Sequence, residues 1–375
     1  MRVLIIGAGI GGLAAARALH ADGHQVTVFE QAPGLRHTGA AVTLWSNGTG
    51  ILAELGVPLA GAGAPIDTLD SRAADGKLLT SVDVAQAAVH YGHPHICLPR
   101  SRLLDGLAAG LPAGLLEFGR TCTGARQEAG RVSAIFADGT AVPGDLLIAA
   151  DGRGSAVRDQ LWGGDPGRLT GWATWQGITP IPTSITTSRR SVLYLGRAGS
   201  CGLMPAGDGL LQWWFDQRWP PDSPGTPQVA VLRQRFGGWA APIPEVLAAI
   251  TDADIGFFPH YRQRVPRTWG RGRITVLGDA AHVMPPTRAQ GANQALEDAW
   301  TMAQTLRTGT DVPTALRAFE RARSRPAGLV ARQAGREDYN RYGTLLNRLI
   351  PGRLASGYYT RWLGRVSTYL AGPAR

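Results

Sequence analysis

Glycines and one acidic residue near the start of the chain have the types and the spacing of a phosphate-binding turn. Gly7-Ala8-Gly9-Ile10-Gly11-Gly12 follows the apolar residues 3–6, and Glu30 ends the next apolar stretch. Gly7 would permit a tight turn, Gly9 would let the backbone approach a pyrophosphate, and Gly12 would let a helix pack closely on a strand. Glu30 could accept hydrogen bonds from ribose hydroxyls. The pattern predicts a dinucleotide site but does not distinguish FAD from NAD.

Two further motifs favour FAD. Gly278-Asp279 ends an apolar stretch at 274–277, and a proline-containing loop then leads to a helix that we expect to begin at Gly291. Asp279 could bind a ribityl hydroxyl, and the amides of residues 291–293 could stabilise a reduced, anionic flavin. The third motif, at 151–158, begins with Asp151 directly after another buried strand. Together the three motifs predict a ligand as long as FAD.

The elements that must position these motifs alternate between strand and helix. Residues 3–6, 13–19 and 26–29 form a strand-helix-strand unit, residues 115–135 have the pattern of antiparallel strands, and a helix is expected over 291–306. Residues 171–260 are rich in Trp and in strand-like alternation, and the chain is helical after 313. We therefore expect an α/β fold with a Rossmann-like FAD-binding domain, an antiparallel-sheet substrate domain and C-terminal helices.

The expected domains are discontinuous. Residues 1–70, 96–170 and 265–310 form the FAD-binding domain, residues 71–95 and 171–264 form the substrate-binding domain, and residues 311–375 form a C-terminal helical segment. This arrangement follows from the places where the strand pattern changes and later returns.

The charge of the chain is concentrated near its C-terminus. The net charge is +10, and residues 317–375 alone carry twelve Arg and three acidic residues. These arginines have the spacing of the polar sides of helices, so we expect them to face water and not nucleic acid. The apolar sides are expected to be buried; they comprise Tyr342, Leu345, Leu346, Leu349 and Ile350, followed by Tyr359, Trp362, Leu363 and Val366.

The cysteines and the hydropathy of the chain limit which classes of protein remain possible. Cys97, Cys122 and Cys201 are widely spaced and odd in number, which favours a reducing cytoplasm and predicts neither disulfides nor a metal site. No apolar run approaches the roughly 18 residues of a membrane span, so we expect no stable membrane insertion.

The three motifs resemble those of the single-component (group A) FAD-dependent aromatic hydroxylases with the p-hydroxybenzoate hydroxylase fold. The likeness runs through most of the chain and is greatest to the branch of salicylate and urate hydroxylases, through residues 39–48, 175–177, 237–242 and 297–299. It implies noncovalent FAD, NADPH or NADH as a transient reductant, and O2 as co-substrate. It further implies that a flavin hydroperoxide oxygenates an electron-rich aromatic molecule, with the enzyme a monomer or a homodimer.

The resemblance also implies which residues hold FAD. Glu30, Gln31 and Thr43 would lie near the adenosine half, Arg100 near the phosphates and ribose, and Cys122 against adenine through its backbone. The full expected set is Gly7, Gly9, Gly12, Glu30, Gln31, Thr43, Arg100, Cys122, Asp151, Asp279, Pro286, Ala289, Gln290, Gly291, Ala292 and Asn293.

The loop at 286–291 departs from the family pattern Pro-x-x-Gly-Gln-Gly. Ala289 replaces a glycine beside the flavin, and Arg288 adds a charge that could meet a carboxylate or carbonyl of the substrate. His282, after the Gly-Asp motif, is expected to hold the loop in place and not to act as a base.

The expected substrate pocket is aromatic and uncharged, lined by Trp175, Ser200, Gln212 and Trp214. Ser200 and Gln212 stand where urate hydroxylases of the family hold urate with Arg and Tyr, which argues against urate. Tyr261 stands where many relatives have Asp, and it joins Arg288 and Gln212 as a candidate catalytic residue.

The expected function is therefore oxygenation of a bulky aromatic or polycyclic small molecule, in secondary metabolism. A flavin-dependent halogenase is disfavoured, because its Trp-x-Trp-x-Ile-Pro segment is missing and Lys77 is the only lysine. Two alternatives stay open. One is an enzyme of the same fold that catalyses epoxidation, oxidative decarboxylation or cyclisation, and the other is a flavin-binding module without catalysis.

Overall fold

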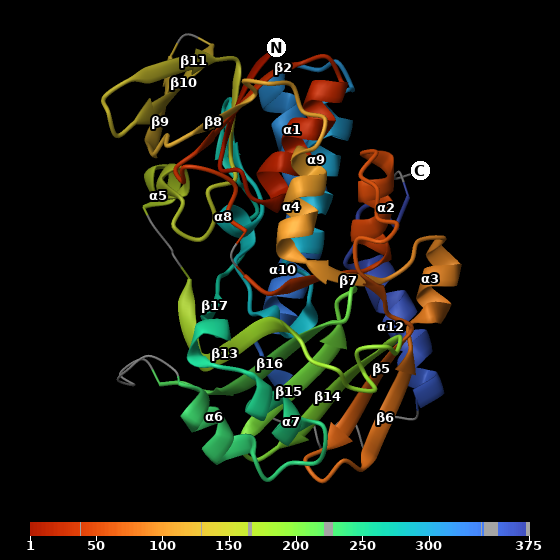
Figure 1. The fold of residues 1–375 in the computed structure, drawn as a ribbon. Coiled ribbons are helices and arrows are strands. Elements are labelled where there is room, and N and C mark those ends of the chain that lie inside the picture. The colour runs from red at the N-terminus through yellow and green to blue at the C-terminus, as the bar shows by residue number, and fades with distance from the viewer. Residues whose placement is uncertain are drawn as a thin grey trace.

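The computed structural model describes residues 1–372 except residues 38, 129, 164–166, 221–227, 339 and 341–351. Two large sheets lie one above the other in Figure 1, and the C-terminal helices, drawn in blue, run beside both. We call the upper one the N-terminal sheet and the lower one the central sheet.

The N-terminal sheet, as far as the structure describes it, has six strands in the order β18-β19-β12-β1-β2-β8, parallel except for β18. Its strands are β1 (Arg2–Ile6), β2 (Gln25–Glu30), β8 (Leu116–Phe118), β12 (Leu146–Ala149), β18 (Gly270–Arg271) and β19 (Ile274–Val276). The helices α1 (Ile10–Ala21), α4 (Arg100–Ala108) and α9 (Gly291–Leu306) lie close together beside it in Figure 1. Because β1, β12 and β19 are adjacent and parallel, the three motifs that follow them meet at one edge of the sheet.

The central sheet has seven described strands in the order β17-β13-β16-β15-β14-β5-β6, antiparallel except for the β14–β5 pair. They are β5 (Thr68–Ala73), β6 (Leu78–Asp83), β13 (Arg168–Pro180), β14 (Arg190–Gly196), β15 (Gly199–Pro205), β16 (Leu210–Arg218) and β17 (Gly256–Arg262). One face packs on α6 (Val229–Phe236) and α7 (Ile243–Ala249) through an apolar core that includes Trp213 and Phe215. We call the opposite face the inner face.

Smaller elements complete the described chain. Two three-stranded sheets have the orders β11-β10-β9 and β3-β7-β4 in the described residues. Their strands are β3 (Ala41–Leu44), β4 (Ala64–Pro65), β7 (Ile96–Pro99), β9 (Cys122–Glu128), β10 (Arg131–Phe136) and β11 (Ala141–Gly144). The remaining helices are α2 (Ser46–Glu54), α3 (Ala85–Tyr91), α5 (Ala156–Trp162), η1 (Asp252–Asp254), α8 (Asp279–His282), η2 (Pro286–Arg288), α10 (Val312–Ala334) and α12 (Gly352–Arg365).

The expected α/β fold class is confirmed, with one correction to its strands. β9 and β10 are antiparallel as expected, but β8 pairs with β2 in parallel and extends the N-terminal sheet. The expected boundary at residue 70 falls inside β5, whose partners β14 and β6 both belong to the central sheet. Strand pairing, which a linear pattern does not encode, decides both points.

The C-terminal helices bury apolar residues as the sequence indicates, but one of the described arginines does not face water. Trp362, Leu363 and Val366 are buried and Tyr359 is half-buried, whereas the face expected at 342–350 lies outside the described residues. The expectation that the arginines face water is wrong for Arg323, which is fully buried.

Arg323 is buried because acidic partners surround it. Its Nε donates to Asp298 Oδ1 at 2.8 Å, and its Nη1 lies 3.4 Å from Glu297 Oε2 and donates to Thr368 Oγ1. Glu297 in turn accepts the backbone amides of Thr368 and Tyr369. The guanidinium therefore joins α9, α10 and the chain after α12.

We expect Arg323→Met to lower the free energy of unfolding by about 3–5 kcal/mol, because it leaves two buried carboxylates without their cation. Arg307→Met is the matched control. Arg307 pairs with Asp22 at 2.8 Å with half of its side chain exposed, so its loss costs about 1 kcal/mol or less. Urea unfolding monitored by circular dichroism measures both. Equal losses in the two variants would contradict the anchoring role of Arg323.

Candidate flavin site

The glycine turn after β1 has the geometry of a phosphate cradle. Gly7 has φ +101, and a Cβ there would lie 2.5 Å from the carbonyl oxygen of Ala150. A Cβ on Gly12 would collide with the carbonyl of Gly7, whereas one on Gly9 would meet no described atom within 4 Å. Gly9 also caps α1, and no described side chain covers the first amides of that helix. Those amides are open to an anion.

Glu30 closes the turn from the neighbouring strand. Its Oε2 accepts the Ala8 amide and its Oε1 accepts the Ala32 amide, both at 2.9 Å, and Arg36 lies 3.8 Å away. The carboxylate thus fixes the turn while keeping lone pairs for a ligand hydroxyl. Gln31, the next residue, is exposed.

The charges of Asp279 and Arg100 interact with each other, and the charge of Arg100 also interacts with Glu30 beside the glycine turn. Burial lowers the pKa of Arg100, and the charges of Asp279 and Glu30 oppose that shift. Asp279 keeps exposed surface. Desolvation by the surrounding protein nevertheless raises the pKa of its carboxyl, and the charges of His282, Arg100 and Arg153 only partly oppose that rise. An exposed carboxyl so closely surrounded is suited to bind a ligand hydroxyl.

Buried acid–base pairs hold the Gly278-Asp279 turn from behind. Asp298 Oδ2 accepts the amide of Gly278 at 2.9 Å and lies 2.6 Å from His282 Nε2. Burial favours the neutral carboxyl, but His282 and Arg323 more than offset it, and the pKa of Asp298 is lowered. His282 is fully buried, so the geometry agrees with a loop-holding role for it.

The loop at residues 286–291, which we call the flavin loop, packs between α2 and α10. Pro286–Arg288 is a short 3-10 turn, and Thr287 Oγ1 donates to the carbonyl of Ala334 at the end of α10. Ala289 then takes a left-handed conformation, φ 47 and ψ 39, before α9 begins at Gly291. Asn293 is fully buried, and its amide group donates to the carbonyls of Thr43 and Ala289.

The start of α9 has the donors that a flavin pyrimidine edge requires. Within the described chain no side chain caps α9, and a Cβ on Gly291 would meet nothing within 4 Å. The Nε2 of Gln290 is buried and has no hydrogen-bond partner among the described residues. Free amides at a helix N-terminus favour negative charge, so the residues present fit a flavin at this place.

Asp151 and Cys122 lie near each other at the opposite end of the site. Burial raises the pKa of the Cys122 thiol, and the Asp151 charge adds to that shift. Burial also raises the pKa of Asp151 itself, whose Oδ1 has no hydrogen-bond partner in the described chain. Arg153, from the same loop, stacks on the ring of Tyr261 at 4.1 Å.

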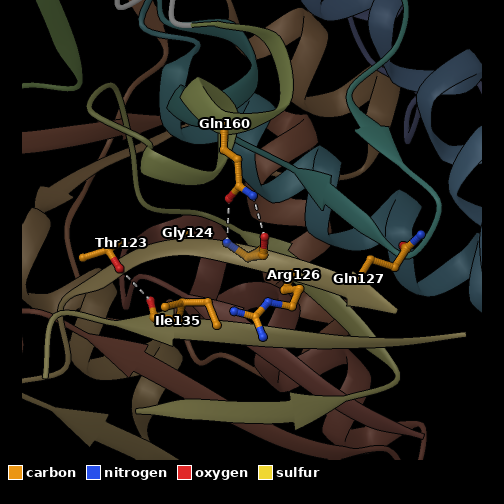
Figure 2. A pocket seen from close by; sticks show the side chains of 7 residues that line it. Thr123, Gly124, Arg126, Gln127, Ile135 and Gln160 are labelled. Atoms are coloured by element: carbon orange, nitrogen blue, oxygen red, sulfur yellow. Dashed lines mark hydrogen bonds between the residues drawn. The ribbon is translucent and has the colours of Figure 1, made fainter. Parts of the chain in front are cut away.

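An open pocket of about 400 Å³ lies along β9, at the residues that follow Cys122 in the sequence (Figure 2). Its lining comprises Thr123, Gly124, Ala125, Arg126, Gln127, Ile135 and Gln160. The Gln160 side chain accepts the amide of Ala125 at 2.7 Å and donates to its carbonyl at 2.6 Å, so the edge of β9 is already satisfied there. None of these residues belongs to the expected FAD set.

The inner face of the central sheet brings together three of the four expected pocket residues. Ser200, Gln212 and Trp214 alternate onto this face, and the Trp214 ring covers Gly202 on the neighbouring strand. Trp175 lies on the other face, in the core against α6 and α7. Its neighbour Gln176 pairs with Trp214, and successive residues of a strand point to opposite faces, so Trp175 points away from the face of Trp214. The expectation that Trp175 lines the pocket is therefore wrong.

The polar residues of the inner face already have partners. Ser200 Oγ lies within hydrogen-bond distance of two acceptors, Asp216 Oδ2 at 3.3 Å and Asn340 Oδ1 at 3.0 Å. Gln212 accepts from the Cys97 thiol at 3.2 Å and donates to the carbonyl of Ala41 at 3.4 Å.

A buried His between two carboxylates is linked to Ser200 through Asp216. His260 Nδ1 is 2.7 Å from Glu337, and its Nε2 is 3.8 Å from Asp216. Burial disfavours the charged ring, but the bond to Glu337 and the charge of Asp216 raise the pKa of His260 overall. Since Glu337 follows α10, this cluster ties the end of that helix to the sheet.

Arg288 and Thr43 do not present free groups to the loop. Arg288 Nη2 lies 3.9 Å from Asp338, with about a fifth of its side chain exposed. Thr43 is buried and its hydroxyl donates to the sulfur of Met204 at 3.4 Å, toward the central sheet.

Sequence reasoning missed Trp45 and Tyr359, which border the flavin loop. The indole of Trp45 donates to the carbonyl of Ala289 at 3.1 Å, and Tyr359 packs edge-on against Trp45 at 5.7 Å. Trp45 lies inside the segment 39–48 that carries the family likeness, so its position was a usable signal. Tyr359 was assigned only to the apolar side of a helix.

Comparison with known proteins agrees with this geometry. A family model described as FAD binding domain matches residues 1–334. The aurachin C monooxygenase/isomerase of Stigmatella aurantiaca is 35% identical over 332 residues, 86% of this chain and 85% of that protein. A FAD-dependent urate hydroxylase of Klebsiella pneumoniae is 30% identical and covers 86% of both chains.

Solved structures show the same fold. The Klebsiella pneumoniae HpxO complexed with FAD and uric acid has a TM-score of 0.91 at 27% identity and covers 97% of each chain. A salicylate hydroxylase substrate complex has a TM-score of 0.79 at 25% identity, covering 100% of this chain and 98% of the other.

The fold and site define a flavoprotein of the group A aromatic hydroxylase class. The chain belongs to the FAD-binding domain family of these enzymes and is an FAD-dependent monooxygenase, an oxidoreductase. No helix in the described ranges is long and apolar enough to cross a membrane.

Gly9→Ala should separate cofactor binding from folding. A methyl group at Gly9 meets no described atom, so we expect the free energy of unfolding of the apoprotein to change by about 0.5 kcal/mol or less. The methyl group stands where a phosphate would approach, and FAD should bind at least about tenfold more weakly, equivalent to about 1.4 kcal/mol. Fluorescence titration of apoprotein with FAD measures this.

Gly12→Ala is the contrasting variant. Its Cβ collides with the backbone of Gly7, so it should destabilise the apoprotein itself. Unchanged FAD affinity in Gly9→Ala would remove the turn from the cofactor site.

Proposed function

We propose that this enzyme uses NADPH or NADH and O2 to oxygenate a bulky, electron-rich aromatic or polycyclic small molecule. The observation that carries the proposal is the inner face of the central sheet, where aromatic and apolar side chains gather and the polar side chains of Ser200 and Gln212 are already paired. Trp214 and Met204 belong to one apolar cluster with Tyr359, and Tyr359 links it to the cluster of Trp45 and Ala289. A large, flat substrate fits such walls.

The chain's own groups supply binding and orientation. Bound FAD supplies the electron transfer and the electrophilic oxygen of the reaction. The open amides of Gly291 and Ala292 would hold the pyrimidine edge, Asp279 a ribityl hydroxyl, and the first amides of α1 the phosphates. The apolar walls exclude water from the reacting centre.

The pairing of Ser200 and Gln212 argues against urate as a substrate. The resemblance implies that urate hydroxylases use Arg and Tyr at these positions, and here both side chains bond to protein groups. A site without partners for a polar substrate discriminates against it by as much as about 10⁴-fold. Arg288, paired with Asp338, remains our candidate contact for a carbonyl or carboxylate at the pocket edge.

A second candidate is a flavin-dependent reaction other than ordinary aromatic hydroxylation. The relative with 35% identity is named a monooxygenase/isomerase, and the flavin loop here carries Ala289 in place of the family glycine. Epoxidation, oxidative decarboxylation and cyclisation belong to this candidate class.

The direct test is NAD(P)H oxidation by the FAD-loaded enzyme with urate, salicylate and larger phenols or indoles, with product masses measured. We expect turnover with a larger aromatic compound, a product heavier by one oxygen, and none with urate. Coupled hydroxylation of urate would contradict the pocket assignment. A product of unchanged oxygen count would favour cyclisation, and a product identified as an epoxide or a decarboxylated compound would favour the other reactions of the second candidate.

Trp214→Ala should raise KM for the aromatic substrate about two- to tenfold, because one aromatic contact contributes about 0.5–1.5 kcal/mol. FAD affinity should not change, since Trp214 belongs to the central sheet, where the proposal puts the substrate and not the cofactor. Parallel steady-state kinetics and FAD titration separate the two effects. A fall in FAD affinity as large as the rise in KM would place Trp214 in the cofactor site instead.

A further inference from the structure

The flavin loop depends on a backbone conformation that its own residue disfavours. Ala289 has φ 47 and ψ 39, in the left-handed region where a Cβ is unfavourable and where glycine has no such penalty. The turn at Ala289 reverses the chain between η2 and α9 and so decides where the first amides of α9 point. Something outside the loop must stabilise this conformation.

Two side-chain donors converge on the carbonyl of Ala289. Trp45 Nε1 donates to it at 3.1 Å and Asn293 Nδ2 at 2.9 Å. Asn293 also accepts the backbone amide of Trp45 at 3.0 Å and donates to the carbonyl of Thr43 at 3.0 Å. The start of α2 and the start of α9 are thereby joined through the strained residue.

The indole of Trp45 is held in the orientation that this bond needs. Trp45 is 4% exposed, and the rings of His95 and Tyr359 pack against it edge-on at 5.2 and 5.7 Å. Burial lowers the pKa of His95 to about 4, so the ring behind the indole is neutral and adds no charge to the loop.

We infer that Trp45 is a positioning residue for the flavin loop. Its indole N–H, together with Asn293, selects the left-handed state of Ala289 and thereby aims the N-terminus of α9 at the flavin pyrimidine edge. The inference rests on the proposed contact between these α9 amides and the flavin. It makes the affinity for FAD proportional to the fraction of molecules in which the loop has this conformation.

The test combines Trp45→Phe with Ala289→Gly. Trp45→Phe keeps an aromatic ring and removes the donor, and FAD titration of the apoprotein should show affinity reduced roughly three- to tenfold, the effect of one hydrogen bond. In the Ala289→Gly background, Trp45→Phe should lower FAD affinity less than about twofold, because glycine adopts the left-handed state without penalty. Amide exchange at residues 289–293 should be faster in Trp45→Phe alone.

Trp362→Phe is the matched control. It removes an indole N–H that donates to Gln333 at 2.7 Å in the same apolar cluster, away from the loop carbonyl. We expect its FAD affinity to stay within about twofold of the parent, the scatter allowed for a site that does not contact the loop. A loss equal to that of Trp45→Phe would attribute the effect to general packing and overturn the inference.

Two other results would overturn it: unchanged FAD affinity in Trp45→Phe, or the same loss in both backgrounds. If Trp45→Phe does not fold, Ala289→Val serves, since a β-branched residue raises the cost of the left-handed state and should weaken FAD more than about tenfold. Equal affinity in Ala289→Val would reject the inference. None of these measurements needs a substrate, so failure of the proposed oxygenation would leave the test intact.

Discussion

The buried carboxylate of Asp298 is the interaction on which the site depends. It accepts a hydrogen bond from the amide of Gly278, contacts His282 and pairs with Arg323 of α10. One side chain of α9 therefore holds the Gly278-Asp279 turn in place and binds α10 to α9. Burial alone would neutralise it, but the pKa is lowered because His282 and Arg323 outweigh burial. A depressed carboxyl pKa means that its contribution to stability is present above the ordinary value near 3.8 and is lost only as pH falls through the folded pKa.

Two helix N-termini then define what the site can bind. α1 and α9 pack on each other at Gly11, where a Cβ would contact Leu277 and Ala295, and in the described chain neither helix begins with a side-chain cap. Each N-terminus carries a partial positive charge. Both are therefore suited to bind anionic or electron-accepting groups, as the proposed contacts with FAD require.

The alternation of side chains along the central sheet places its tryptophans on two opposite faces. Trp175 and Trp213 pack with α6 and α7, whereas Trp214 lies over Gly202 on the inner face. On that same face, the buried cluster of Asp216, His260 and Glu337 attaches the end of α10 to the sheet and binds Ser200. These polar groups of the inner face therefore stabilise the fold.

The sequence by itself determined the fold class, the three motifs and the helix at Gly291–Leu306, because turn glycines and apolar periodicity are local signals. It did not determine the strand order that moved β8 into the N-terminal sheet, nor the phase that turned Trp175 away from the pocket. It did not distinguish Arg323 from the arginines that face water, and it did not show that Trp45 and Asn293 both donate to the carbonyl of Ala289. These features are contacts between residues far apart in the chain, and only tertiary packing decides which side chains lose their water and find one another.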